Sequence, residues 1–157
     1  MIRTSLANHA WESLLTAHAT ILRDFADDPI WREYNLTMRE YDVLYTLAKL
    51  GAPSRLGELQ HNVLLSQPAL SRMVDRLARR GLIARNDDAE DGRAIRVELT
   101  DAGREVQRAV GRAHARSVGR CVGSALDTDE LHELARLTAK LTAAAQDGTP
   151  TDPPAST

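Results

Sequence analysis

Residues 55–100 read RLGELQHNVLLSQPALSRMVDRLARRGLIARNDDAEDGRAIRVELT, and this stretch holds the clearest structural pattern in the chain. It contains a short helix after Arg55, a second helix that begins at Ser66, and a two-stranded hairpin that ends at Leu99. A helix, a turn, a second helix and a hairpin, in this order, make a winged helix-turn-helix. The order of these signals therefore predicts that architecture.

The second helix of this stretch has a defined start, end and buried face. Ser66 is a favourable N-cap, whose side chain accepts a backbone hydrogen bond, and Pro68 falls in the first turn, where its missing N–H is not needed. Gly81 follows the last turn, as a C′ glycine does. Apolar residues at helical spacing predict the buried face: Leu70, Met73, Val74 and Leu77. The opposite face carries Ser71, Arg72, Asp75, Arg76 and Arg79.

The hairpin follows directly after Gly81. Leu82 and Ile83 begin its first strand, and the acidic, glycine-containing segment 87–93 forms its tip. Apolar and charged residues alternate on the return strand, which predicts one buried face: Ile95, Val97 and Leu99 alternate with Arg96 and Glu98.

Positive charge is concentrated around the second helix. Residues 54–86 hold six arginines against two acids, Glu58 and Asp75, a net charge of +4, whereas the whole chain has −2. A basic island on a mildly acidic chain predicts a local contact with a polyanion such as DNA. The alternative is a solvated helix face on which Asp75 pairs with Arg72 and Arg79. We favour DNA because a hairpin follows the helix.

Two segments of the sequence carry a family resemblance. SQPALSRMVDRLARRGLIAR (66–85) followed by DAEDGRAIRVELTDAG (88–103) resembles the MarR family of bacterial transcription regulators, and the likeness covers residues 36–103 in detail. The spacing LARRGLI (77–83) and the DGR tip (91–93) are specific when they occur together. The resemblance implies an obligate homodimer, two winged modules on a pseudo-palindromic operator in double-stranded DNA, repression more often than activation, and often a small-molecule effector.

The length and composition predict one domain without a disulfide or a membrane span. A chain of 157 residues with 43% hydrophobic residues can bury a core of its own. We expect a single MarR-like domain over 1–146 and a disordered tail over 147–157, which has three prolines and no large apolar residue. One cysteine fits a reducing compartment, and neither a secretory pattern nor an apolar run of about 20 residues is present. The expectation is a cytoplasmic protein that does not enter membranes.

Long helices flank the winged segment, over about 5–25 and 100–146. Their apolar stripes are larger than one small winged module can cover, so we expect these helices to form the dimer interface. The fold class is therefore mainly α with a small β wing. The stripes are Trp11, Leu14, Leu15, His18, Ile21, Leu22 and Phe25 in the first helix, and Leu131, Leu134, Leu137, Thr138 and Leu141 in the last.

Capping signals mark the other helix ends. Thr37 and Glu40 make a capping box where the winged segment, about 37–99, begins, and Thr100 and Asp127 are N-caps of the last two helices. Before Thr37 the chain reads as an irregular connection that contains Trp31 and Tyr34. The helix after Thr37 ends at Gly51–Pro53, and its predicted buried face is Tyr41, Leu44, Leu47 and Ala48.

Three glycines, Gly103, Gly111 and Gly119, lie inside the helix that Thr100 begins. Each costs about 1 kcal/mol relative to alanine in a helix interior. We infer that a close helix–helix approach or a bend requires them.

The second helix and the wing supply the candidate DNA contacts. Only the N-terminal part of such a helix goes deep into the major groove, so Gln67, Pro68, Ser71 and Arg72 are expected near base edges. Arg76 and Arg79, further along this helix, and Arg55, before the short first helix, are expected to contact phosphates, which position the duplex without specifying sequence. For the wing, the resemblance implies a minor-groove arginine, Arg93, braced by Asp91; the alternative is that Arg93 only offsets the nearby acids. The expected contact set is Arg55, Ser66, Gln67, Pro68, Ser71, Arg72, Arg76, Arg79, Asp91 and Arg93.

An effector site is expected only from the resemblance, which implies small aromatic or anionic ligands between the dimer helices and the winged module. By position the candidates are Trp11, His18, Trp31, Tyr34 and Arg39. For His18, a core histidine on the apolar stripe is the alternative that we favour.

Arginines recur every four residues from Arg104 to Arg120. A solvated or ion-paired face, with Asp24 as one partner, is favoured over an anion-binding surface for this row.

Cys121 has no second cysteine and is expected to be a small buried residue. The histidines lack metal-ligand spacing, and we find neither a nucleophile elbow nor a phosphate-binding loop. We therefore expect no cofactor, no metal and no enzyme; a winged-helix interaction module without specific DNA binding is the remaining alternative.

Overall fold

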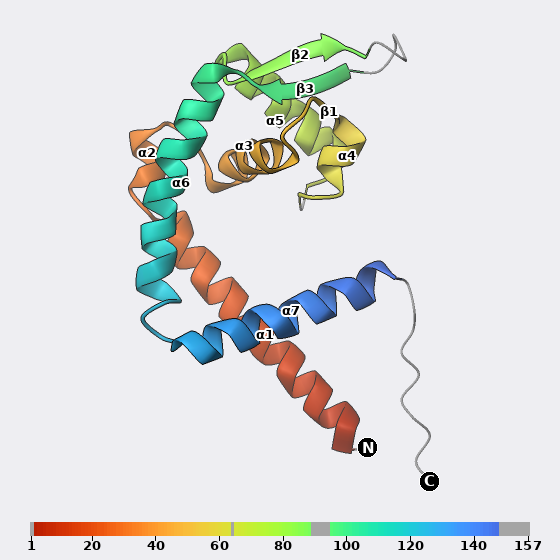
Figure 1. Ribbon diagram of the computed structural model, residues 1–157, viewed down its shortest axis with the longest axis vertical. Helices are drawn as coiled ribbons and strands as arrows, with labels where there is room; N and C mark the ends of the chain where they lie inside the picture. The colour runs from red at the N-terminus through yellow and green to blue at the C-terminus, as the bar shows by residue number, and fades with distance from the viewer. Residues whose placement is uncertain (1, 64, 89–94, 148–157) are drawn as a thin grey trace. The chain divides into compact units, whose positions relative to one another are not determined.

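The computed structural model describes residues 2–63, 65–88 and 95–147. The chain divides into two compact units, Met1–Ser117 and Val118–Thr157. The elements run in the order α1 (Ile2–Ala26), α2 (Ile30–Glu33), α3 (Met38–Leu50), β1 (Ser54–Arg55), α4 (Leu56–Gln60), α5 (Gln67–Arg79), β2 (Ile83–Asp87), β3 (Ile95–Leu99), α6 (Asp101–Cys121) and α7 (Thr128–Gln146) (Figure 1). The predicted fold class, mainly helical with a small β wing, is confirmed.

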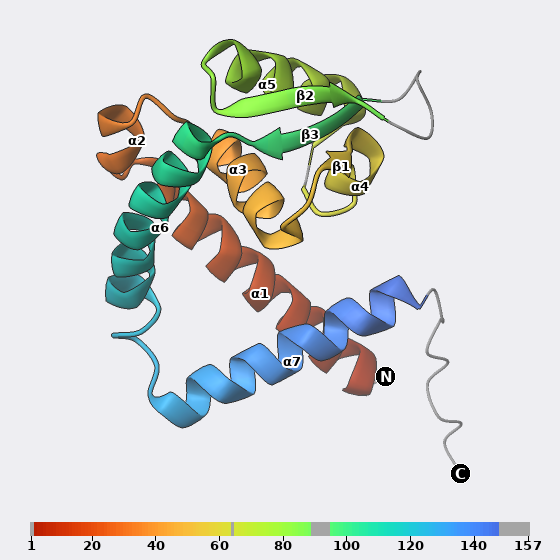
Figure 2. The ribbon, with the colours of Figure 1, turned by 45° about the horizontal axis from the view of Figure 1, so that its top comes forward.

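The wing is a three-stranded antiparallel sheet in the order β1-β3-β2. In β2 and β3, Ile83 pairs with Leu99, as the predicted hairpin requires, and β2 lies alongside α5 (Figure 2). The third strand was not predicted: Ser54 pairs with Val97 and Arg55 with Arg96. A strand of two residues has no alternation that a sequence pattern could reveal.

The core of the first unit lies between α3, α4, α5 and the sheet. The predicted buried face of α5 is confirmed, and Leu44, Leu59 and Val97 are completely buried around it. The prediction for α3 holds for Tyr41, Leu44 and Leu47, which are buried, but is wrong for Ala48, which is exposed.

The capping boxes form as the sequence predicts. The Thr37 hydroxyl accepts from Glu40 N at 3.2 Å, and Glu40 Oε2 accepts from Thr37 N at 2.8 Å. Asp127 makes the same reciprocal pair with Glu130 at the start of α7. Thr100 Oγ1 accepts from Gly103 N at 3.0 Å at the start of α6.

Ser66 occupies the N-cap position of α5, but its side chain makes no capping hydrogen bond, so this part of the prediction is wrong. An N-cap side chain accepts from the second or third helical N–H. Pro68 is the second residue of α5 and has no N–H, so one of the two donors is missing. The helix ends as predicted: Gly81 has a φ of 71°, Gly81 N donates to Ala78 O at 2.9 Å, and Leu82 N donates to Leu77 O at 3.0 Å.

The connection before α3 contains a short helix, α2, so the prediction of an irregular connection is wrong for Trp31, whereas Tyr34 lies in the turn after α2. Asp28 Oδ1 accepts from Ile30 N at 3.0 Å and starts α2. Trp31 is buried, and its Nε1 donates to Phe25 O. The tryptophan thereby ties α2 to the end of α1.

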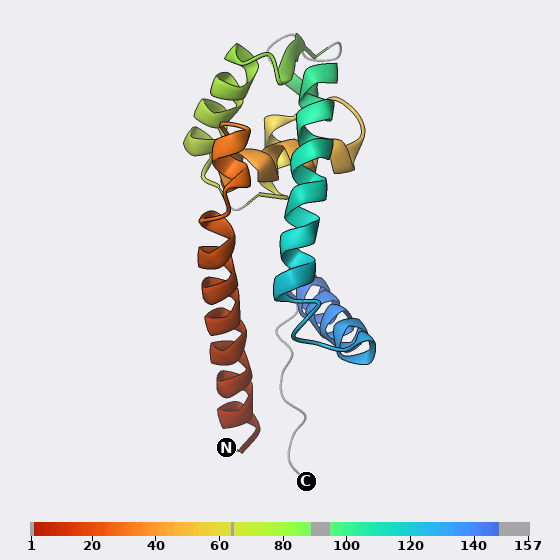
Figure 3. The same ribbon diagram turned by 90° about the vertical axis from the view of Figure 1, so that its left-hand side faces the viewer.

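The apolar stripes of the long helices are largely uncovered within the chain. Figure 3 shows α1 as one uninterrupted helix, on which Trp11 is 58% and Leu15 46% exposed. In the second unit, Leu134, Leu137 and Leu141 of α7 are exposed as well. None of the helices in the described ranges is both long and apolar enough to cross a membrane.

The glycines of α6 have different surroundings. A Cβ on Gly103 would lie 1.9 Å from Leu82 O, so α6 packs directly on the backbone that begins the wing. A Cβ on Gly111 would meet the Tyr41 hydroxyl at 3.0 Å. At Gly119 no described atom outside the local helix lies within 4 Å. Gly103 therefore closely approaches a turn and Gly111 a side chain of another helix, α3, whereas no close approach is seen at Gly119 among the described residues.

Two predicted features lie outside the described residues. The first is the predicted wing contact of Asp91 and Arg93 with DNA, because neither residue is described. The second is the expected tail, of which only Asp147 is described.

Candidate nucleic-acid interface

The exposed face of α5 carries the residues expected at base edges. Gln67 and Pro68 are exposed in the first turn, directly after the exposed Ser66. One turn later Ser71 is half-buried and Arg72 is exposed. The buried leucines on the opposite face hold this surface outward.

Two arginines of α5 are not engaged within the described chain. Arg72 and Arg79 are exposed, and neither forms an ion pair with any described residue. Asp75 instead pairs with Arg85 of β2. The alternative in which Asp75 neutralises Arg72 and Arg79 is therefore wrong, and both guanidinium groups face solvent.

A buried acid holds Arg76 of α5 and Arg80, the C-cap residue that follows this helix. Glu40 is 4% exposed, and its Oε1 accepts from Arg76 Nε at 2.7 Å and lies 3.8 Å from Arg80 Nη1. Burial raises the pKa of Glu40, but hydrogen bonds from Thr37 and from the Arg76 guanidinium outweigh it, so the pKa of this carboxyl is lowered. Glu40 is therefore a buried carboxylate, and it anchors the C-terminal half of α5.

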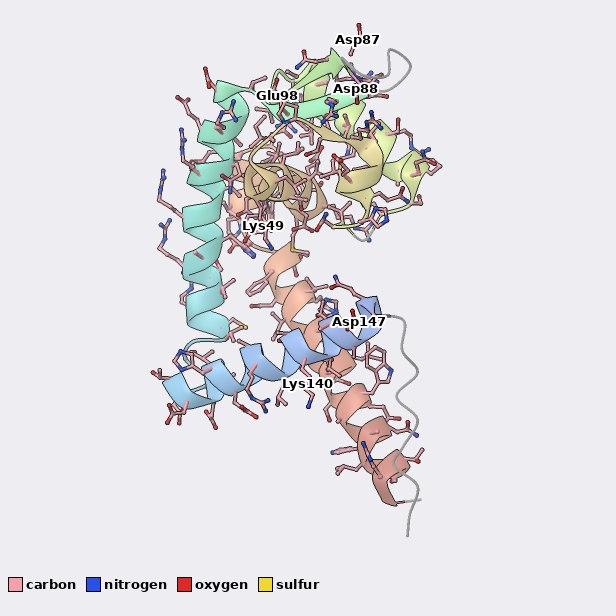
Figure 4. All side chains as sticks on the ribbon, turned by 45° about the vertical axis from the view of Figure 1, so that its right-hand side comes forward. Lys49, Asp87, Asp88, Glu98, Lys140 and Asp147 are labelled. Atoms are coloured by element: carbon pink, nitrogen blue, oxygen red, sulfur yellow. The ribbon has the colours of Figure 1, made fainter. Side chains whose placement is uncertain are left out.

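Arg55 is held at the end of the sheet where β2 ends and β3 begins. Asp88 Oδ2 accepts from Arg55 Nε at 2.6 Å and from Arg96 Nε at 3.0 Å, and Arg96 Nη1 donates to Pro53 O at 3.1 Å. The Asp88 side chain is 1% exposed and lies at the end of β2 (Figure 4). The sequence grouped Asp88 with the acids near Arg93, which lies outside the described residues; within the described ranges Asp88 pairs with Arg55 and Arg96.

A hollow of about 740 Å³ lies between α1 and the segment from α2 to α3. It brings together three of the expected effector residues, His18, Trp31 and Arg39; Trp11 and Tyr34 are not part of its lining. His18 is exposed in this hollow, so the core-histidine alternative is wrong. The lining residues are His18, Ala19, Leu22, Arg23, Ala26, Trp31, Leu36, Thr37, Met38 and Arg39.

An aromatic cluster next to this hollow was not predicted. The ring of His114 lies 5.0 Å from that of Phe25, 5.6 Å from Trp31 and 5.7 Å from Tyr41, measured between ring centroids. His114 Nδ1 is buried and has no hydrogen-bond partner among the described residues. The four residues come from α1, α2, α3 and α6, so no local pattern could have grouped them.

The arginine row on α6 is exposed. Arg104 lies 3.6 Å from Asp101, whereas Arg108, Arg112 and Arg116 form no ion pair inside the described ranges. The expected pairing with Asp24 is not seen in them. Cys121 is half-buried, and the same ranges contain no group of three or more His, Cys, Asp or Glu side chains that could hold a metal.

Comparisons with known proteins agree with this geometry. Residues 36–95 match the sequence model of the MarR family. The HTH-type transcriptional regulator PecS of Dickeya dadantii (strain 3937) is 32% identical over 89 residues, which are 55% of this chain; the chain thus spans about half, 54%, of PecS.

Solved structures show the same fold over most of the chain. AbsC, a MarR family transcriptional regulator from Streptomyces coelicolor, matches with a TM-score of 0.76 at 24% identity. The match covers 89% of this chain and 94% of AbsC. Sco3205, another MarR family regulator from that organism, was solved in complex with DNA; it has a TM-score of 0.74 at 28% identity, over 88% of this chain and 86% of Sco3205.

Proposed function

The chain belongs to the MarR family, and from this premise we propose that it is a sequence-specific, double-stranded DNA-binding transcriptional regulator that acts as a homodimeric repressor. Two copies of α5 would enter successive major grooves of a pseudo-palindromic operator, about 10 bp apart. The relatives are transcriptional regulators rather than enzymes, so we assign no catalytic role.

The free cationic face of α5 is the observation that carries this proposal. Arg72 and Arg79 are exposed and lack ion-pair partners in the described chain, while the other face of the helix is fully anchored in the core. Unpaired guanidinium groups on a rigid helix suit a phosphate or a guanine edge, because neither partner has to be released from the protein first. The DNA complex of Sco3205 supports the same use of the fold.

The positions on α5 suggest a division of labour. Arg72, in the first half of the helix, is suited to bridge guanine O6 and N7, and Gln67 to bond adenine. Arg79, in the last turn, suits a phosphate, which positions the protein without reading sequence. Arg76 and Arg55 keep half-exposed side chains of 50% and 40% and are assigned to phosphates as well.

Dimerisation is supported by the uncovered leucines of the long helices. Large apolar side chains clustered on one helix face usually mark an interface. On α7, Leu134, Leu137 and Leu141 recur at helical spacing and are 41%, 45% and 59% exposed. A second copy is the occupant that the family implies.

The hollow lined by His18, Trp31 and Arg39 supports a small effector. Its volume of about 740 Å³ lies in the range of ligand pockets, and its apolar walls with two arginines suit a small aromatic anion. We propose that such a ligand binds one conformation of the dimer better and thereby lowers operator affinity.

The deciding experiment is binding of the purified protein to its own upstream intergenic DNA, with random DNA as competitor, at two salt concentrations. Tight, salt-sensitive binding that prefers the upstream DNA supports the proposal. Weak binding that is equal for both DNAs, together with a dimer mass and no preferred genomic fragment, would favour an interaction module instead.

A further inference from the structure

The buried Glu40 carboxylate connects two regions that the proposed function treats separately. One of its oxygens, Oε2, accepts from Thr37 N at 2.8 Å and from Thr37 Oγ1 at 3.1 Å. The other, Oε1, accepts from Arg76 Nε at 2.7 Å and faces Arg80 Nη1. Thr37 lines the hollow next to α1, Arg76 lies in the last turn of α5, and Arg80 is the C-cap that follows it.

We propose that Glu40 is the positioning residue of the DNA-reading helix and that it transmits changes at Thr37, in the wall of the hollow, to α5. This inference rests on the proposed function, because it assigns α5 to DNA. It adds a residue that touches neither the DNA nor a ligand and acts through Arg76 and Arg80.

The division of the two oxygens shows that Glu40 does more than cap α3. A capping box needs only one acceptor oxygen, and glutamine serves there as well as glutamate. In α7, Glu130 makes the same box with Asp127 and has no arginine partner in the described chain. At Glu40 the second oxygen accepts from Arg76 of α5. Two acceptor oxygens are therefore in use, which a carboxylate provides and an amide does not.

The contacts around Arg80 extend the same link. Arg80 is half-buried, and its Nη2 donates to Tyr34 O at 3.3 Å in the connection between α2 and α3. The C-terminal end of α5 is therefore held at two points, by the Glu40 carboxylate and by Tyr34 O. Arg76 lies one turn after Arg72 in the same helix. A shift of the Glu40 carboxylate that moves Arg76 therefore also displaces Arg72, the arginine assigned to bases.

The buried charge of Glu40 favours keeping the ion pair with Arg76. A buried carboxylate without its cation is uncompensated, so a shift of Glu40 is expected to move Arg76, and α5 with it, rather than to break the pair. Arg76 remains 50% exposed, so its outer nitrogens can reach a phosphate while Nε stays on Glu40.

The test compares Glu40→Gln with Glu130→Gln as the matched control. Both changes preserve a capping box, and only the first removes a carboxylate from arginine. We expect Glu40→Gln to weaken operator binding about tenfold, with a smaller loss for random DNA, and Glu130→Gln to change neither. Hydrogen exchange of the α5 amides, measured without DNA, is expected to rise in Glu40→Gln only.

A double-mutant cycle tests transmission from the hollow. Thr37→Val removes the hydroxyl and keeps the shape of the side chain. We expect it to weaken operator binding several-fold when Glu40 is present and to have no further effect in Glu40→Gln. An equal effect of Thr37→Val in both backgrounds would overturn transmission through Glu40.

Unchanged α5 exchange and unchanged operator discrimination in Glu40→Gln would overturn the positioning role. If that variant does not fold, Arg80→Gln is measured in its place. Faster hydrogen exchange of the amides in the last turn of α5 is then the expected result, and exchange at the wild-type rate would overturn the positioning role. Failure of the proposed function is distinguishable, because then the wild-type protein itself prefers no DNA fragment, whereas α5 exchange still reports on the anchor.

Discussion

The arginines of α5 differ in what holds them, and this difference sets their expected roles. Arg76 and Arg80 are bound to Glu40, whereas Arg72 and Arg79 have no ion-pair partner in the described part of the chain. A free guanidinium loses no protein contact when it binds DNA, so substitution of Arg72 or Arg79 reports mainly on the interface.

Arg72→Ala is expected to reduce the preference for operator over random DNA, because a bidentate base contact is worth about 1–3 kcal/mol of discrimination. Arg79→Ala should weaken binding to all sequences similarly and lower the salt slope by about one unit. Competition titrations at several salt concentrations measure both. An equal loss on operator and random DNA for Arg72→Ala would contradict its assignment to bases.

The ionisation of Glu40 predicts a dependence of stability on pH. Its pKa in the folded protein is below the ordinary value of 4.5, since the hydrogen bonds from Thr37 and Arg76 outweigh burial. The unfolded chain therefore binds the proton more readily, and the contribution of Glu40 is complete above pH 4.5 and is lost as the pH falls through the lower folded pKa. Urea unfolding from about pH 6 to about pH 3 should show a smaller acid loss in Glu40→Gln than in wild type.

At the scale of elements, the junction between the wing and α6 is a close backbone contact. Gly103 sits against Leu82 O, and Thr100 Oγ1 donates to Gly81 O at 2.6 Å while Thr100 N donates to Leu82 O at 3.2 Å. The start of α6 is therefore fixed to the turn that ends α5. A movement of α6 is coupled to the base of the wing through backbone atoms.

Gly103→Ala is expected to destabilise the fold by roughly 1–3 kcal/mol or more, because its Cβ would overlap a backbone carbonyl that cannot move aside. Gly119→Ala, in the same helix, is the control: it meets no atom within 4 Å and should stabilise by about 0.5–1 kcal/mol. Thermal and urea unfolding measure both changes. A neutral Gly103→Ala would contradict the close packing.

At the scale of the whole molecule, the uncovered leucines predict that stability depends on protein concentration. If Leu134, Leu137 and Leu141 lie in a dimer interface, the Tm of the wild-type protein rises with concentration, because association favours the folded state.

Leu137→Glu is expected to shift the mass in sedimentation velocity from dimer toward monomer, since it places a charge among these leucines. Ala139→Glu lies about 200° away around α7 and serves as the control that keeps the dimer. A monomeric wild-type protein, or a dimer that tolerates Leu137→Glu unchanged, would contradict the proposed interface.

Much of the fold was predictable from local patterns. The buried face of α5, the Thr37–Glu40 capping box and the Gly81 helix end follow from residues three to five positions apart, because helical periodicity and capping act over that range. The candidate face for DNA was also predictable, because the arginines of α5 lie opposite its apolar stripe.

The partners of the charged residues depended on the tertiary structure. Glu40 and Arg76 are 36 positions apart and Arg55 and Asp88 are 33 apart, so chain folding alone brings them together. The same holds for β1, which is too short to show a period, and for His114 among three aromatic rings from other helices. Local interactions define where helices begin, end and face the core, whereas the pairing of distant charges is chosen by packing, because only packing determines which of them share a dry environment.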